Sequence, residues 1–212
     1  MCSRVRAEIH FRRATEIAPT PSAWFNLGIA RARRGAPAAA AEALRSALDL
    51  NAEHIPAWHQ LALIEFERGA FGEAAEAWQE ASNREPGNAD HDHNRALALQ
   101  HAERFDEAET SYRRALEARP DAPATWSNLA ALHRTRGQLT EALECAHRAL
   151  EIDPDHADAH NNLANVHLDR DEFTEATAAC ERALALQPDH VAARRLHDEI
   201  QRRFATVAPI SL

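Results

Sequence analysis

Five carboxamide side chains recur along the chain at a constant spacing of 34 residues, which makes them the first candidates for binding chemistry. They are Asn26, Gln60, Asn94, Asn128 and Asn162. A carboxamide carries both a donor and an acceptor, so it can bond to both polar groups of a peptide amide without contacting the partner's side chains. The row therefore predicts a surface that holds a polypeptide backbone.

Histidine is abundant, with 13 residues, and raises the question of a metal site. His156 and His160 stand four residues apart, but no third ligand has a fixed spacing from them, and zinc sites use at least three protein ligands. We therefore expect neither a metal nor another cofactor. Three further histidines near the carboxamide row, His59, His93 and His101, would make binding sensitive to mild acid.

No motif in the chain predicts catalysis. The sequence lacks a phosphate-binding glycine loop, a nucleophile elbow, a dinucleotide-binding fingerprint and a zinc-protease helix. Its three cysteines, Cys2, Cys145 and Cys180, have no paired spacing. Cys145 and Cys180 fall on the apolar side of predicted helices, so we expect packed thiols rather than a disulfide or a nucleophile. The sequence predicts a protein that is not an enzyme.

Residues 123–156 show the kind of element that positions these side chains. Trp126 and Leu129 lie three residues apart and form one apolar stripe of a helix. Gly137 permits the left-handed conformation that ends a helix, and a second stripe, made mostly of alanine, continues until Pro154 stops it. The segment predicts a helical hairpin whose apolar faces are too small to form a core alone.

The hairpin recurs along the chain, and tryptophan occupies the same place in three copies, at positions 24, 58 and 126. The repeats divide the chain into a partial repeat at 1–20 that supplies only a second helix, five repeats at 21–54, 55–88, 89–122, 123–156 and 157–190, a capping helix at 191–204 and a flexible tail at 205–212. This 34-residue helix–turn–helix pattern resembles the tetratricopeptide repeat family.

The resemblance implies an all-α fold, a right-handed superhelical solenoid of antiparallel helix pairs, in which the first helix of each pair lines a concave groove. The carboxamide row is similar to that of the superhelical repeats in the O-linked N-acetylglucosamine transferase family, where asparagines hold extended polypeptide. Asparagine is also frequent at this position in tetratricopeptide repeats generally. Direct contact with a ligand and plain inheritance of the repeat pattern both remain open.

The same resemblance places further residues in the groove, with apolar side chains in its first half and polar ones in its second. The candidates beside the row are Phe25, Ile29, His59, Phe66, His93, Asn161 and Asn165. We predict that a partner anchors an apolar side chain or a helix near the first three repeats and extends across the polar end. The alternative is that neighbouring helices cover part of the apolar set.

Four residues depart from the repeat pattern. Asp92 and Arg95 put charge where the third repeat should bury tryptophan and leucine, which predicts that this repeat is the loosest. Glu103 and Asp171 replace the glycine of the turn. Each of these should cost up to about 1 kcal/mol if it adopts a positive φ.

The formal net charge of −9 argues against duplex DNA or an anionic membrane as the main partner. We see no secretory signal and no membrane-spanning segment, so we expect a cytoplasmic protein, and the use of arginine to the exclusion of lysine indicates a GC-rich, bacterial genome. The half-repeat leaves an apolar edge around Val5, Ile9 and Phe11, which would suit self-association with a second copy.

Together these features predict a non-catalytic scaffold or adaptor that binds an extended or helical polypeptide in the concave groove. Two alternatives come from other functional classes. The chain would serve as a substrate-recognition or regulatory segment for a glycosyl- or sulfotransferase, or it would be a self-assembling structural module.

Overall fold

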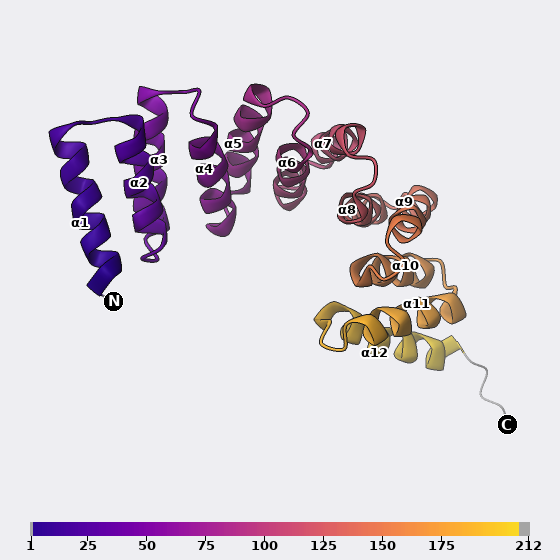
Figure 1. The fold of residues 1–212 in the computed structure, drawn as a ribbon. Helices are drawn as coiled ribbons and strands as arrows, with labels where there is room; N and C mark the ends of the chain where they lie inside the picture. Colours follow the sequence, from indigo (N-terminus) through magenta and orange to yellow (C-terminus); the bar gives the residue numbers. More distant parts are fainter. Residues whose placement is uncertain (1, 208–212) are drawn as a thin grey trace. The chain divides into compact units, whose positions relative to one another are not determined.

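The computed structural model describes residues 2–207, and this part of the chain contains twelve α-helices and no strand (Figure 1). The predicted all-α fold is confirmed. The helices form two compact units, α1–α7 and α8–α12, with the division after Ala118. No helix in the described residues combines the length and the apolar character that a membrane span requires.

Short loops join the seven helices that the structure describes in the first unit. Their bounds are α1 (Cys2–Ile17), α2 (Pro21–Ala32), α3 (Pro37–Leu50), α4 (Ile55–Glu67), α5 (Phe71–Arg84), α6 (Ala89–His101) and α7 (Phe105–Ala118). Each helix from α1 to α6 packs against the next one along the chain, and α2 also contacts α4. The unit is therefore a serial stack in which successive helix pairs lie side by side (Figure 1).

The second unit continues the same pattern. Its described helices are α8 (Pro123–Thr135), α9 (Leu139–Ile152), α10 (Ala157–Asp169), α11 (Phe173–Leu186) and α12 (Val191–Val207). Here α10 contacts both α8 and α12. The first helices of the pairs, α2, α4, α6, α8 and α10, begin at intervals of 34 residues.

Alanine makes most of the contact between paired helices. One repeat position is alanine in every pair, and its members are all 0% exposed: Ala40, Ala74, Ala108, Ala142 and Ala176. Side chains this small let two helix backbones approach closely, so the pairs pack without a thick layer of large residues. The core of each unit is accordingly a row of thin helix–helix contacts.

The two turns that lack glycine adopt the strained geometry expected of them. Glu103 has a φ of 58° and Asp171 a φ of 59°, close to the 74° of Gly137 at the equivalent turn. The condition for the expected cost, a positive φ, is therefore met at both residues. The Asp171 carboxylate also accepts a hydrogen bond of 2.6 Å from Arg203 of α12, which offsets part of the strain.

Of the two charged residues of the third repeat, Asp92 is buried and Arg95 is half-buried, and both have polar partners. Asp92 is 3% exposed and accepts a hydrogen bond of 3.0 Å from the Ser82 hydroxyl, with Arg114 3.7 Å away. Arg95 donates a hydrogen bond to the Ser111 hydroxyl. These partners come from α5 and α7, the two helices that flank α6. The looseness of this repeat stays a prediction.

The last helix is longer than expected, because α12 extends to Val207 whereas the predicted end was residue 204. No helix-breaking residue follows Phe204 until Pro209, which is beyond the last residue of α12. Residues 208–212 of the predicted tail lie outside the described residues. The side chain of Cys2 does so as well.

The other two cysteines are packed thiols, as predicted. Cys145 and Cys180 are both buried and take part in no disulfide among the described residues. Burial, with a smaller contribution from the charge of Glu181, raises the pKa of the Cys180 thiol to about 11. Because the thiolate is the reactive form, Cys180 is poorly suited to nucleophilic chemistry.

Candidate functional site

A groove with a volume of about 700 Å³ lies in the first unit between α1, α2 and α4. Its lining residues are Ala7, Phe11, Phe25, Asn26, Ile29, Ala30, Ala32, Arg33 and Gln60. Four of the predicted site residues, namely Phe25, Asn26, Ile29 and Gln60, therefore meet in one place. We call this feature the first-unit groove.

Helix α2 presents its groove residues from one side. Phe25 and Ile29 are four residues apart and so lie one turn from each other on the same face. Leu27 and Gly28 are buried on the opposite side, which faces the core. The Thr20 side chain caps the helix by accepting a hydrogen bond of 3.2 Å from the backbone N–H of Ala23. The register of the helix thus determines which residues reach the groove.

The wall that α1 contributes was not predicted. The sequence assigned Phe11 to an uncovered edge of the half-repeat, whereas the structure places Phe11 and Ala7 in the lining of the groove. The available signal was the position of α1, because a second helix that precedes a repeat packs against the first helix of that repeat. Phe11 adds a second aromatic ring to the apolar lining that Phe25 and Ile29 provide.

The groove combines apolar surface with two carboxamides. Asn26 is exposed and Gln60 is half-buried, and the Gln60 amide lies 3.5 Å from a ring nitrogen of His59. The ring of Phe25 is half-buried and lies 5.0 Å from the ring of His54. A bulky apolar side chain of a partner would be removed from water against such a lining. The carboxamides would bond to the partner's backbone and fix its direction.

The other predicted residues of the first unit lie outside this lining. His59 packs edge-on against Trp78, with ring centroids 4.7 Å apart, and His93 packs against Tyr112 at 5.8 Å. Burial, followed by the charge of nearby His91, lowers the pKa of His59. The fold therefore favours neutral His59. The contribution of this residue to stability is complete above the ordinary histidine pKa of 6.5 and declines as the pH falls below it.

Phe66 also has aromatic neighbours of its own. Its ring lies 5.2 Å from Phe71 and 5.3 Å from His101, and the rings of Phe71 and His101 stack at 4.8 Å. Asn94 is half-buried on α6. A role for these residues in binding stays a prediction.

In the second unit, the predicted residues bond mainly to one another and to adjacent helices. The Asn162 amide donates hydrogen bonds of 2.9 Å to the carbonyl and to the hydroxyl of Ser127, which ties α10 to α8. The Asn165 amide donates to the carbonyl of Asn161 at 2.8 Å, and Asn161 itself is only 8% exposed. Asn128 is half-buried on α8. The carboxamide of Asn162 thus has a structural bond whether or not it meets a ligand.

Among the residues that the structure describes, no group of three or more histidine, cysteine, aspartate or glutamate side chains could hold a metal ion. The histidines at the ends of repeats have other contacts. His156 accepts a hydrogen bond of 3.2 Å from the backbone N–H of Ala159 and so caps α10. A ring nitrogen of His160 lies 2.9 Å from the carbonyl oxygen of Pro154.

Two family models, both described as tetratricopeptide repeat, match the sequence. One matches residues 87–155 and 121–189, and the other matches residues 6–55. No curated protein sequence matches the chain.

Solved structures with the same fold cover most of the chain. One is YrrB, described as a TPR protein with an unusual peptide-binding site, at a TM-score of 0.69 and 21% identity over 89% of this chain and 97% of that one. A MamA fragment from Desulfovibrio magneticus RS-1 has a TM-score of 0.71 and 16% identity over 81% of this chain and 97% of that one. PilF of Pseudomonas aeruginosa has a TM-score of 0.69 and 17% identity over 93% of this chain and 90% of that one. At these identities the likeness concerns the fold.

Proposed function

The chain belongs to the tetratricopeptide repeat family, and from this premise we propose that it is a non-catalytic scaffold or adaptor that binds an extended or helical polypeptide in the first-unit groove. Members of the family generally act as protein-interaction scaffolds, and their repeat domains are typically non-catalytic. The observation that carries the proposal is the convergence of Phe25, Asn26, Ile29 and Gln60 on one groove.

The apolar residues and the carboxamides that line the groove would have different roles in binding. Phe11, Phe25 and Ile29 would take an apolar anchor from the partner, and burial of such an anchor supplies most of the affinity. Asn26 and Gln60 would bond to the partner's backbone and set its register. YrrB, whose structure has the same fold, is described as having an unusual peptide-binding site, and this description supports a polypeptide as the class of ligand.

Removal of the apolar lining tests the proposal. Random 12-residue peptides displayed on phage would be selected on the wild-type chain and then measured against a Phe25→Ala/Ile29→Ala variant. We expect the selected peptides to lose at least about 10-fold in affinity, because truncation of two apolar anchors costs about 1.4 kcal/mol or more. An Asn26→Ala/Gln60→Ala variant should lose about 10-fold through its backbone bonds.

The matched control removes exposed apolar side chains at another place. Leu50 and Val191 are 51% and 59% exposed and do not line the groove. A Leu50→Ala/Val191→Ala variant should bind the selected peptides like the wild type. Equal binding by the groove variants and the control would refute the groove as the peptide site.

The exposed apolar surface of α1 favours a second candidate function, self-association of the chain. Val5, Ile9 and Ile17 are 41%, 47% and 83% exposed, and Ile17 lines a further cavity of about 560 Å³ at the end of α1. Exposed apolar side chains in one group are typical of a protein-interaction surface. The transferase-associated alternative stays a prediction.

Sedimentation velocity tests the self-association. We expect the wild-type chain to form dimers as its concentration rises, and an Ile9→Asp/Ile17→Asp variant to remain monomeric because a charge in an apolar interface loses its hydration. A Val191→Asp variant, which changes an exposed apolar residue of α12, should behave like the wild type. Monomeric wild-type protein at all concentrations would contradict this candidate.

A further inference from the structure

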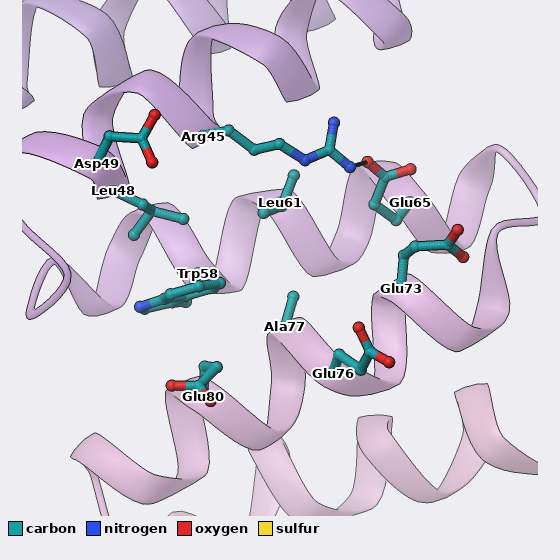
Figure 2. Close-up of a pocket in the computed structure, with 10 residues that line it drawn as sticks. All are labelled: Arg45, Leu48, Asp49, Trp58, Leu61, Glu65, Glu73, Glu76, Ala77 and Glu80. Carbon is teal, nitrogen blue, oxygen red and sulfur yellow. Dashed lines mark hydrogen bonds and ion pairs between the residues drawn. The ribbon is translucent and has the colours of Figure 1, made fainter.

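A second cavity of the first unit, with a volume of about 610 Å³, lies between α3, α4 and α5 (Figure 2). It shares no lining residue with the first-unit groove. The lining consists of Arg45, Leu48, Asp49, Trp58, Leu61, Glu65, Glu73, Glu76, Ala77 and Glu80. Its size is typical of pockets that take up a ligand side chain or a small ligand. We call it the acidic pocket, because five of its residues are carboxylates and one is a base.

Two of the five carboxylates have arginine partners. Glu65, only 1% exposed, accepts hydrogen bonds of 2.5 Å from Arg45 and 2.7 Å from Arg68. Glu80 accepts a hydrogen bond from Arg84. The charges of these two acids are therefore balanced within the chain.

The other three carboxylates have no bonded arginine among the described residues, although the charges of Glu76 and Arg104 act on each other. Asp49, Glu73 and Glu76 are all exposed, and none forms an ion pair with another residue that the structure describes. Figure 2 shows Asp49 on one side of the pocket and Glu73 and Glu76 on the other, with the apolar side chain of Leu61 between them. The pocket thus carries a net negative charge around an apolar floor.

Trp58 forms an aromatic wall that already holds one guanidinium group. Its indole N–H donates a hydrogen bond of 2.7 Å to the carbonyl of Ala52, which fixes the plane of the ring. The Arg84 guanidinium lies 5.3 Å from the ring centroid and 3.3 Å from Glu53. Aromatic faces and carboxylates are the two groups that arginine prefers as partners. The chain's own Arg84 shows that this wall accommodates a guanidinium.

One acid of the rim, Glu80, is specific to this repeat. At the repeat position of Glu80, the next three repeats carry arginine instead, at Arg114, Arg148 and Arg182. At the position of Glu76, the last repeat carries Ala178. Glutamate recurs at the position of Glu73, as Glu107, Glu141 and Glu175, and at the position of Glu76, as Glu42 and Glu144, so it is Glu80 that distinguishes this rim from the repeat pattern.

We propose that the acidic pocket binds an arginine side chain from a basic segment of a protein partner. The aliphatic part of that side chain would lie on Leu48, Leu61 and Ala77, as the stems of long cations commonly lie on apolar surface. Its guanidinium would pair with the carboxylates at the rim, which match its forked donors. The proposal does not depend on the first-unit groove.

Fluorescence anisotropy of a fluorescein-labelled hexa-arginine peptide with the full chain tests the proposal. At about 0.15 M salt, we expect the wild type to bind the peptide. A Glu73→Gln/Glu76→Gln variant should have a Kd at least about 10-fold higher, because two carboxylates of the rim lose their charge. An Asp49→Asn variant should weaken binding from the opposite side of the pocket. Hexa-lysine should bind more weakly than hexa-arginine, since lysine lacks the planar fork.

The chain offers a control of equal charge. Glu141 and Glu144 occupy the same repeat positions on α9 as Glu73 and Glu76 on α5, two repeats later. A Glu141→Gln/Glu144→Gln variant should bind hexa-arginine like the wild type. An equal loss in this control would show diffuse attraction and overturn the proposal, as would the absence of binding to the wild type. A loss of hexa-arginine binding in the Phe25→Ala/Ile29→Ala variant would place the peptide in the first-unit groove and would also overturn the proposal.

Discussion

A Gly28→Ala variant should be less stable than the wild type by about 1–3 kcal/mol, because the added methyl group overpacks a filled contact. A Cβ atom at this position would lie 2.8 Å from Cγ and 3.0 Å from Cδ2 of Leu44, and 3.2 Å from the carbonyl oxygen of Ala40. Leu44 is 0% exposed, so it has no solvent into which it could move. The clash therefore falls on the packing of α2 against α3.

This expectation runs against both helix propensity and the repeat pattern. Alanine favours helix over glycine by about 1 kcal/mol. Every other repeat has alanine at this position, at Ala62, Ala96, Ala130 and Ala164, and all four are 0% exposed. A consensus argument would therefore choose Gly28→Ala as a stabilising change, whereas the contact with Leu44 predicts the opposite.

Urea unfolding, followed by far-UV circular dichroism, measures the effect, and Gly72→Ala is the matched control. Gly72 lies near the start of α5, and a Cβ atom there would meet nothing within 4 Å. This control should raise the free energy of unfolding by about 0.5–1 kcal/mol. A Leu44→Ala change should cost less in the Gly28→Ala background than in the wild type. Equal or greater stability of Gly28→Ala would contradict the prediction.

The helical period could be predicted because it depends on local chemistry. Trp126 and Leu129 define one helix face, Gly137 the turn and Pro154 the end, and the structure places a helix pair there. Glu103 and Asp171 were recognised from the sequence as the residues that replace the turn glycine, and both have a positive φ. Such features depend on neighbours within a few residues, so a single sequence contains them.

Features that depend on several helices at once were harder to predict. Phe11 joins the first-unit groove because α1 packs on α2, which the pattern of one helix does not show. Asn161 was predicted to line the polar half of the groove, but it is almost buried. The acidic pocket was missed, because its carboxylates come from three helices, α3, α4 and α5, and share no motif.

Arg95 shows how neighbouring helices compensate for a departure from the repeat pattern. It stands where the other repeats have leucine, at Leu27, Leu61, Leu129 and Leu163, all of which are buried. Burial lowers the pKa of Arg95, and its Nε atom is buried without a hydrogen-bond partner. Its carboxylate neighbour Glu107, at 3.8 Å, is bonded more closely by Arg104, at 2.7 and 2.8 Å. The partners of Arg95 therefore offset the cost of burying its charge only in part.

An Arg95→Leu variant should consequently be more stable than the wild type by about 1–2 kcal/mol, because an apolar residue replaces an imperfectly paired buried charge. Leucine would leave no new unsatisfied group. The Ser111 hydroxyl already donates a hydrogen bond of 2.9 Å to the carbonyl of Glu107, and the Glu107 carboxylate keeps Arg104.

An Arg95→Ala variant separates the removal of charge from the filling of space. The chain already has a cavity of about 130 Å³ beside Arg95 and Leu99, and alanine would enlarge it. We expect this variant to be about 1–2 kcal/mol less stable than Arg95→Leu, since the lost apolar contact adds a cavity cost. Urea unfolding of the three proteins at pH 7 measures both differences. A leucine variant that unfolds at a lower urea concentration than the wild type would show that the bonds of Arg95 to Ser111 and Glu107 outweigh its desolvation.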